Sequence, residues 1–361
     1  MRRLLGALSL VLLASLSLGG RLTPEENAQR LRICGKPLSA LQNAAPPQPA
    51  SSPDDDEDDG PQFKVMGGRD SGRRPHAVQV IYKFDKEKDP APCGGTMISS
   101  RHVLTAAHCV YDYWKFCPIM GMRTGVSERK DYIRDDLSAW TIVLKSRCGT
   151  MNNDEECNSK DPKIFAKPKK IFANRRFVDA KCMQGGDIAI IELDRDFGPE
   201  LGVVPACLAT ESTVVDRYTN LTSFGWGSDP TLKYQGKIFH NILQEIDLKE
   251  QNCPGGSPLD VICTEEKSDK NVCSGDSGGG LTLGKPITGY TAVVGLVSTG
   301  TGCEKMFVFP WMKFDGGMFT DTRLYNGFIC KVTGVCPMRR RDRAKRFRKQ
   351  QKVVVDEIDV Y

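Results

Sequence analysis

The pattern of apolar and polar positions predicts many short strands and little helix. From Val65 onward, short runs rich in Val, Ile, Leu, Thr and aromatic residues alternate with stretches of Gly, Pro, Asn and Asp. Runs of this kind, bounded by turn-forming residues, are typical of a β-sandwich or β-barrel. We expect strands at Ala77 to Phe84, Thr96 to Thr105, Trp140 to Lys145, Asp187 to Leu193, Tyr218 to Phe224, Thr291 to Ser298 and Met318 to Thr322.

The N-terminal residues have a different pattern, in which a basic start precedes a single apolar run. Arg2 and Arg3 are followed by apolar residues from Leu4 to Leu18 and then by small residues. This is the layout of a secretory signal peptide. The run is shorter than the roughly 18 to 20 residues that span a membrane. We therefore expect residues 1–19 to be a signal peptide, the protein to be secreted and extracellular, and no membrane span.

Two further segments lack the apolar residues that a core requires. Residues 20–64 contain clustered prolines and the acidic run Asp54 to Asp59, a composition that does not pack. We expect them to form a propeptide. The run Arg339 to Lys352 holds nine Lys or Arg residues and one Asp, so the net charge of +5 arises in a basic tail at residues 336–361. The folded domain is expected at residues 65–335.

The cysteine count is even, at 14. In a secreted chain this indicates a framework of disulfides. The alternative is a zinc site, but no two cysteines stand two residues apart, and the four histidines lack the spacing of metal ligands. We expect no metal and no cofactor.

Three motifs carry candidate chemistry. In the GDSGG motif, Ser277 lies among glycines that let backbone N–H groups approach a carbonyl closely. His108 lies in the motif LTAAHC, and Asp187 lies in the motif GDIAIIEL. Taken alone, the GDSGG motif could be a flexible turn, His108 a buried core imidazole, and Asp187 the cap of a turn. Together, in the order His, Asp, Ser, they indicate a serine nucleophile activated by a histidine base.

These motifs resemble those of the trypsin/chymotrypsin-type serine proteases, over roughly Val65 to Cys330. The LTPEEN stretch before Cys34 resembles a divergent trypsin-like branch found in nematodes. The resemblance implies an all-β fold of two packed antiparallel six-stranded β-barrels, with the active site between them and a short C-terminal helix. It also implies a secreted serine endopeptidase.

The resemblance assigns a role to each residue of the motifs. Ser277 would attack the scissile carbonyl, His108 would transfer the proton, and Asp187 would orient and stabilise the imidazolium. The N–H groups of Gly275 and Ser277 would form the oxyanion hole. Ser298 would support the buried aspartate beside the bound substrate.

The same resemblance implies that the protein is made as a zymogen. The KVMGG sequence at residues 64–68 matches the family's activation junction, with Val in place of the usual Ile. Cleavage after Lys64 would create an ammonium group on Val65. This group could bury beside Asp276 and order the loop of the nucleophile, because a buried carboxylate without a partner is costly.

Most cysteines match bridges of the family. The implied pairs are Cys93–Cys109, Cys253–Cys263, Cys273–Cys303 and Cys34–Cys207, the last of which would keep the propeptide attached after cleavage. We also expect Cys330 to pair with Cys336. Cys117, Cys148, Cys157 and Cys182 lie in the unusually long span between His108 and Asp187, and they allow three pairings. Another common bridge is absent, because Leu221 and Leu283 occupy both of its positions.

The implied primary pocket has an uncharged floor. Asn271 stands where trypsin has an aspartate, and Gly300 and Gly317 match two wall glycines that keep the pocket open. A neutral floor predicts cleavage after large apolar or aromatic residues, or after amide-bearing ones. Asp269, two residues away, is an alternative source of charge. With a neutral pocket, another trypsin-like protease must cut after Lys64.

Expected partners are protein or peptide substrates and an activating trypsin-like protease, but no nucleic acid. The basic tail could bind polyanions, and Asn220 begins a glycosylation sequence. The alternative function is a secreted, inactive protease-like binding protein that acts through inserted loops or the tail. Thr299 in place of the family's Trp, and Gly280 in place of its Pro, favour that alternative.

Overall fold

The computed structural model describes residues 20–42, 66–83, 91–112, 117, 134–150, 155–180, 182, 184–235, 242–284, 290–314, 316–337 and 358–360. The expected signal peptide, the acidic run, the junction residues Lys64 and Val65, and the basic run of the tail lie outside the described residues. Among the described residues, no helix is both long and apolar enough to cross a bilayer.

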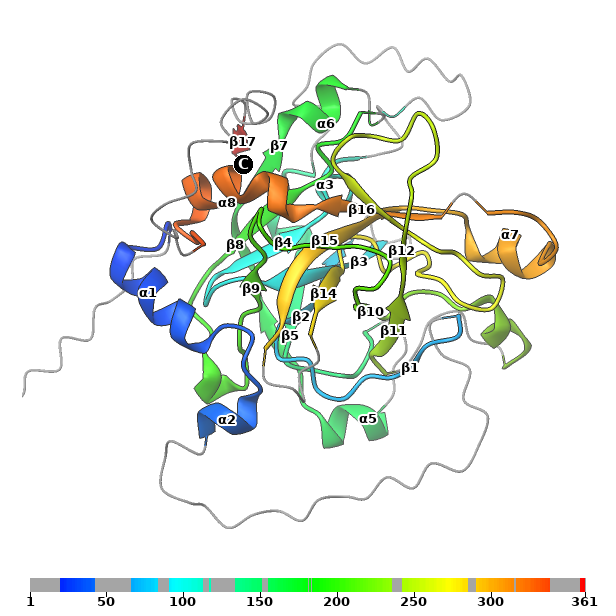
Figure 1. Ribbon diagram of the computed structural model, residues 1–361. Coiled ribbons are helices and arrows are strands. Elements are labelled where there is room, and N and C mark those ends of the chain that lie inside the picture. Colours follow the sequence, from blue (N-terminus) through cyan, green and yellow to red (C-terminus); the bar gives the residue numbers. More distant parts are fainter. Residues whose placement is uncertain are drawn as a thin grey trace, which may run out of the picture.

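Two curled antiparallel sheets form most of the fold (Figure 1). The first has the strand order β17-β7-β8-β4-β3-β2-β5-β6. The second has the order β1-β11-β10-β14-β15-β16-β13-β12, with β9 parallel to β15. Each sheet closes partly into a half-barrel, and a short helix follows the last strand of the second sheet. The expected all-β fold with two barrel-like halves is confirmed; short edge strands extend the sheets to eight and nine strands.

The strands of the first sheet are β2 (Ala77–Tyr82), β3 (Ala91–Met97), β4 (His102–Thr105), β5 (Trp140–Leu144), β6 (Ile164–Ala166), β7 (Pro168–Asn174), β8 (Ala189–Leu193) and β17 (Ile358–Val360). Those of the second are β1 (Arg69–Asp70), β9 (Cys207–Leu208), β10 (Leu221–Gly225), β11 (Gln244–Leu248), β12 (Glu250–Gln251), β13 (Val261–Thr264), β14 (Gly280–Leu283), β15 (Ala292–Thr299) and β16 (Gly317–Asp321).

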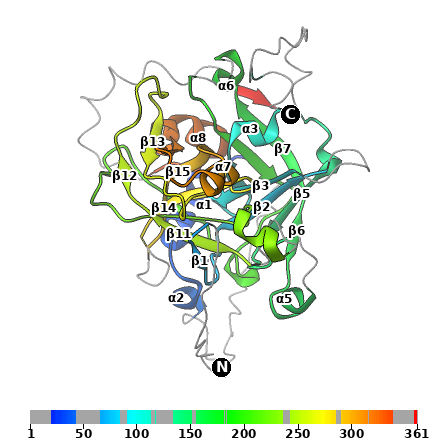
Figure 2. The same ribbon diagram turned by 90° about the vertical axis from the view of Figure 1, so that its right-hand side faces the viewer.

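Short helices connect and cover the sheets. The α-helices are α1 (Pro24–Ile33), α2 (Leu38–Gln42), α3 (Ala107–Val110), α5 (Glu155–Lys160), α6 (Arg175–Asp179), α7 (Cys303–Val308) and α8 (Asn326–Thr333). The 3-10 helices are η2 (Leu137–Ala139), η3 (Pro199–Leu201), η4 (Pro230–Gln235) and η6 (Thr322–Tyr325). The helices α1 and α7 lie on opposite sides of the molecule, and Figure 2 brings α7 to the front.

Six of the seven predicted strands each correspond to one observed strand. The run from Thr96 to Thr105 instead supplies the end of β3 and all of β4. The turn between them is held by Ser99, whose Oγ accepts the N–H groups of Arg101 and His102 at 3.1 and 3.0 Å. The serine hydroxyl accepts backbone N–H groups that, in a continuous strand, would be free to pair with a neighbouring strand.

Each sheet buries its own apolar cluster, and a third cluster joins the two. Trp140 and Ile142 lie in the first core, and Phe319 and Leu281 in the second. The third cluster packs Leu104, Ile190 and Leu296 against Ile329 of helix α8, together with Leu22. The contact between the two halves is therefore apolar and closely packed behind the candidate site.

The described part of the leader, residues 20–42, packs on the domain rather than standing apart. Helix α1 begins at a capping box, in which Thr23 and Glu26 satisfy each other's backbone N–H groups. Arg101 donates to Glu26 at 2.6 Å and to the carbonyl of Gly20 at 2.9 Å. The N–H of Leu22 donates to the carbonyl of Thr333 at 2.6 Å. The leader is thus tied to the turn between β3 and β4 and to the end of helix α8.

Candidate active site

The pairing of two strands places the candidate histidine and aspartate together. Strand β4 is antiparallel to β8, and Thr105 lies opposite Ala189. His108 follows Thr105 by three residues and Asp187 precedes Ala189 by two, so both side chains leave the sheet at the same edge. Asp187 is buried, with 4% of its surface exposed, whereas His108 is partly exposed.

Asp187 accepts hydrogen bonds from three directions. Its Oδ2 lies 2.8 Å from Nδ1 of His108, and its Oδ1 accepts the backbone N–H of His108 at 2.9 Å. Ser298 donates its hydroxyl to Oδ2 at 2.6 Å. Because an ionised carboxylate only accepts, Nδ1 carries the proton, and Nε2 of the neutral ring is left with a lone pair.

The environment keeps Asp187 ionised. Burial by itself would raise the pKa of the Asp187 carboxyl, but the charge of His108 and the hydrogen bonds from His108 and Ser298 outweigh burial. The net pKa of Asp187 therefore lies below its usual value. A carboxylate fixed in this way can hold one tautomer of the imidazole and can stabilise its protonated form.

The loop of Ser277 packs beside the histidine. The carbonyl of Ser277 accepts the N–H of Gly94 at 2.7 Å. Cys93, which precedes Gly94, is bonded to Cys109, and the sulfur atoms of this pair lie within 4.8 Å of a ring nitrogen of His108. Two of the three groups in this cluster are therefore joined in a disulfide, so it is not a metal site.

Two glycines give the loop its shape. Gly275 has a φ of 99° and Gly278 a φ of 79°, values that side-chain-bearing residues rarely adopt. A Cβ on Gly278 would also lie 2.3 Å from Oγ1 of Thr105 and 2.7 Å from the carbonyl of Gly94. The close approach of the loop to β3 and β4 therefore requires glycine.

The loop exposes two backbone donors. Gly278 and Gly279 donate their N–H groups to Val297 and Asp276. By contrast, no acceptor among the described residues takes the N–H groups of Gly275 and Ser277. Two free backbone donors, separated by one residue and close to a serine hydroxyl, form an arrangement that can stabilise an oxyanion.

Asp276 points away from the site into the second half of the domain. It is 1% exposed and accepts the N–H groups of Gly227 and Cys273, each at 2.8 Å. Met66 is buried against the Cys273–Cys303 bridge, and its carbonyl accepts the N–H of Asn271 at 3.0 Å. The residue that follows Val65 therefore docks beside the loop that carries Ser277.

The residues of the predicted primary pocket also meet. A Cβ on Gly317 would lie 3.8 Å from Oδ1 of Asn271, and a Cβ on Gly300 would lie 3.4 Å from Cα of Gly317. Glu266 was not predicted from any motif and also contacts this cluster: its Oε1 would lie 2.6 Å from a Cβ on Gly300. Asp269, the alternative charged residue, is exposed instead. No sequence motif points to Glu266, because only the folded structure brings it next to the two wall glycines.

A family model described as Trypsin matches residues 65–309 of the chain. The chain is 33% identical over 275 residues to the trypsin-like protease try-5 of Caenorhabditis elegans, a match that covers 71% of this chain and 81% of that protein. It is 26% identical to phenoloxidase-activating enzyme 1 of Spodoptera litura, with coverage of 82% and 79%, and 28% identical to phenoloxidase-activating factor 3 of Holotrichia diomphalia, with coverage of 67% and 66%.

The chain belongs to the trypsin family of serine proteases. The nematode resemblance seen in the sequence agrees with the try-5 match. The two leucines that replace a family disulfide lie directly opposite each other, Leu221 on β10 and Leu283 on β14. The trypsin-family register of these strands is therefore kept, with an apolar pair where the bridge would be.

The structure of this trypsin-family chain contains seven disulfides among the described residues. The pairs are Cys34–Cys207, Cys93–Cys109, Cys117–Cys182, Cys148–Cys157, Cys253–Cys263, Cys273–Cys303 and Cys330–Cys336. Of the three pairings that the sequence left open in the long span, the structure has Cys117 with Cys182 and Cys148 with Cys157. Asn220 is exposed at the start of β10, where its Oδ1 accepts Nζ of Lys249 at 2.8 Å.

Proposed function

We propose that the chain is a secreted serine endopeptidase, made as a zymogen, that hydrolyses peptide bonds through an acyl-enzyme on Ser277. The observation that carries this proposal is the chain of hydrogen bonds from Ser298 through Asp187 to Nδ1 of His108. It ends beside a serine loop with two free N–H donors. Family membership supports protease chemistry in general.

The proposed reaction has two stages. Nε2 of His108 takes the proton of the Ser277 hydroxyl while Oγ bonds to the scissile carbonyl carbon. The oxyanion then accepts the N–H groups of Gly275 and Ser277. As the carbon–nitrogen bond breaks, His108 returns the proton to the leaving amine, and an ester remains on Ser277. Water attacks the ester in the same manner, which releases the acid and restores the hydroxyl.

The proposed activation depends on the segment after Lys64. Met66 is already docked against the Cys273–Cys303 bridge. Cleavage before Val65 would convert an amide into an ammonium group one residue away, within the same region as the buried Asp276. An ion pair formed there would hold the Ser277 loop in the geometry that exposes its N–H groups.

The domain boundaries are part of this proposal. Residues 1–19 would be a signal peptide, 20–64 a propeptide that remains linked through Cys34 and Cys207, 65–335 the protease domain, and 336–361 a basic tail. Two relatives are named for activating phenoloxidase. By analogy, the substrates would be proteins and the activator another trypsin-like protease. Binding of polyanions by the tail and glycosylation of Asn220 stay predictions.

A direct test is labelling with a fluorophosphonate, which reacts with an activated serine whatever the pocket prefers. A site-specific cleavage sequence would replace the residues before Val65, so that the protein is cut only there. We expect labelling of the cut protein, little labelling of the uncut protein, and none of the Ser277→Ala variant. Absence of labelling in folded, cut protein would favour the inactive binding protein instead.

A further inference from the structure

Glu266 lies among the residues that match the walls and floor of the primary pocket. Its Oε1 accepts the backbone N–H of Thr301 at 2.8 Å and Nδ2 of Asn271 at 3.0 Å. Its Oε2 accepts the N–H of Gly316 at 3.2 Å. Thr301 follows the wall residue Gly300, and Gly316 precedes the wall residue Gly317. The carboxylate therefore spans the two wall segments and contacts the floor.

The negative charge of Glu266 has no cationic partner. Its three donors are two backbone amides and one neutral side-chain amide, and none of them carries a charge. Within the described part of the chain, no Lys or Arg forms an ion pair with Glu266, whereas its neighbour Glu265 contacts Lys267 at 3.9 Å. Two carboxylate oxygens can accept about four hydrogen bonds, so Glu266 can accept another donor.

Asn271 cannot take the role that its position suggests. Its Nδ2 donates to Glu266, to the carbonyl of Thr301 at 3.3 Å and to Sδ of Met306 at 3.1 Å. Its Oδ1 accepts the N–H of Val272 at 2.9 Å. Both ends of the amide therefore already bond within the protein, and Asn271 is only 1% exposed, whereas Glu266 is partly exposed. The polar group that remains able to meet a substrate side chain is the carboxylate of Glu266.

We propose that Glu266 is the residue that determines primary specificity, and that it selects a Lys or Arg side chain on the substrate. This inference rests on the proposed endopeptidase function. It replaces the expectation of cleavage after large apolar residues, which considered only the uncharged Asn271. An ammonium or guanidinium group that enters the pocket beside Gly300 and Gly317 meets a carboxylate that has no cationic partner among the described residues. An apolar side chain there would bury that charge without a partner, which is costly.

The kinetic test compares peptide substrates that differ only in the residue before the cleaved bond. We expect the cut enzyme to cleave after Arg and Lys at least a hundredfold better, in kcat/KM, than after Phe or Leu. In Glu266→Gln, cleavage after Arg should fall by about a hundredfold, as expected when one partner of a desolvated charge pair is removed. Cleavage after Phe should change much less. The matched control is Glu265→Gln, which should behave as wild type.

A second test measures binding to the pocket and needs no catalytic activity. Benzamidine, a phenyl ring with a cationic amidine, would be titrated calorimetrically into the cut Ser277→Ala protein with and without Glu266→Gln. We expect binding to weaken by about a hundredfold in the double variant. Equal affinity in the two folded proteins, or a wild-type preference for Phe over Arg, would overturn the inference.

The two proposals fail in different ways. Fluorophosphonate labelling without a preference for Arg or Lys would refute the role of Glu266 and leave the protease proposal standing. Benzamidine binding that depends on Glu266, in a protein that is never labelled, would refute the protease proposal and leave the proposal of an acidic, cation-binding pocket. Circular dichroism of each variant would show that the fold is retained.

Discussion

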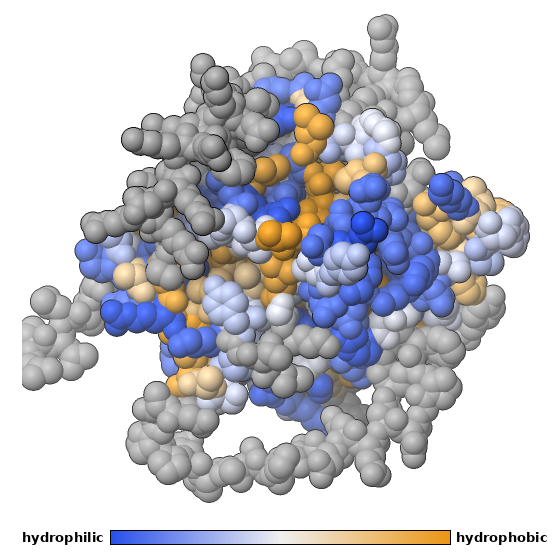
Figure 3. Space-filling view, viewed as in Figure 1, coloured by the Kyte–Doolittle hydropathy of each residue, from blue (hydrophilic) through white to orange (hydrophobic). Residues whose placement is uncertain are grey.

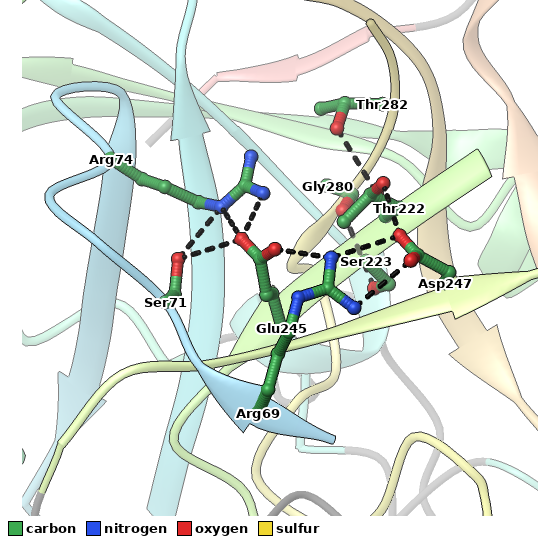
Figure 4. A network of polar contacts seen from close by, with 9 residues as sticks. All are labelled: Arg69, Ser71, Arg74, Thr222, Ser223, Glu245, Asp247, Gly280 and Thr282. Carbon is green, nitrogen blue, oxygen red and sulfur yellow. Dashed lines mark hydrogen bonds and ion pairs between the residues drawn. The ribbon is translucent and has the colours of Figure 1, made fainter. Parts of the chain in front are cut away.

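The guanidinium of Arg74 is buried against the carboxylate of Glu245, which joins the beginning of the protease domain to strand β11 (Figure 4). Nε of Arg74 donates to Oε2 of Glu245 at 3.0 Å and to Oγ of Ser71 at 2.9 Å. Arg69 binds Glu245 from the other side and donates to Asp247 at 2.9 Å. The residues just after the proposed activation junction are thus fixed to the second half by charge.

Glu245 should matter for stability far more than its neighbour Asp247. Replacement of Glu245 with Gln leaves the buried Arg74 without a counter-charge, a change that typically costs about 3 to 5 kcal/mol. The control Asp247→Asn removes a carboxylate whose side chain is 40% exposed, and about 1 kcal/mol or less is expected. Urea unfolding of both variants measures the difference. Equal losses of unfolding free energy in the two variants would show that the buried Arg74–Glu245 pair contributes no more than an exposed ion pair.

Two buried histidines should make stability depend on pH. Burial, aided by the charge of a neighbouring arginine, lowers the pKa of His76 and of His102 to about 3. Oγ of Ser99 already accepts two N–H groups, so its hydroxyl donates to Nδ1 of His102 at 2.8 Å and fixes the neutral ring. The protein buries both rings without their charge.

The sign follows from the lowered pKa values. Between pH 6.5 and 3, the unfolded chain binds protons that the folded chain does not, so stability is complete above about pH 6.5 and falls below it. Each histidine contributes at most about 1.4 kcal/mol per pH unit. Unfolding free energies at pH 7, 6 and 5 should fall less steeply for His102→Asn than for wild type. Equal slopes of unfolding free energy against pH in the two proteins would contradict a buried, neutral His102.

The leader should stay with the protease after activation. In the uncut chain Cys34 and Cys207 are separated by 173 residues, so their bond constrains a long loop and should contribute about 5 kcal/mol; after the cut it is the covalent link between the two pieces. Cut wild-type protein should run as one species without reductant and as two with it. The double Cys34→Ser/Cys207→Ser variant should separate in denaturant alone.

The matched control is the double Cys330→Ser/Cys336→Ser variant. This bond closes a loop with a separation of six residues, and its removal should leave the leader covalently attached. Electrophoresis with and without reductant distinguishes the two variants. A leader that dissociates from cut wild-type protein without reduction would show that the Cys34–Cys207 bond does not form.

Most of the fold and the candidate triad could be predicted, because their signals are local. His108 and Asp187 lie in short motifs at strand ends, and a single register, Thr105 opposite Ala189, brings them together. The turn at Ser99 was missed because β-prone residues continue on both sides of it. A hydrogen-bonding serine, rather than Gly or Pro, makes the turn.

Glu266 could not be predicted, for a different reason. Its partners Thr301 and Gly316 are 35 and 50 residues away in sequence, and no periodicity relates positions that distant. Helix α7 lies in the sequence between the two wall segments and is at the front of Figure 2. Apolar residues at its end and just after it are exposed, namely Val308, Phe309, Trp311 and Met312, and pale orange atoms appear at the right of Figure 3, where Figure 1 places α7.

Ser298 should affect the rate of the reaction more than substrate binding. Its hydroxyl donates to Oδ2 of Asp187, the atom that also binds Nδ1 of His108. In Ser298→Ala, the lost donor raises the pKa of Asp187 toward its usual value and loosens the imidazole. We expect kcat to fall about tenfold, somewhat less than for loss of an oxyanion donor, with KM little changed. Steady-state kinetics, with Ser257→Ala as the control, would check this, and an unchanged kcat would contradict it.

An acidic pocket would also let the enzyme cleave its own activation site. The residue before the junction is Lys64, which a neutral pocket would reject and a pocket carrying Glu266 would accept. Uncut Ser277→Ala protein, incubated with a trace of cut wild-type enzyme, should be cleaved before Val65, as N-terminal sequencing would show. Cut Glu266→Gln enzyme should do this about a hundredfold more slowly, and a Lys64→Gln substrate should resist both enzymes. If wild type leaves the junction intact while it cleaves Arg peptides, activation requires another protease even though the pocket is acidic.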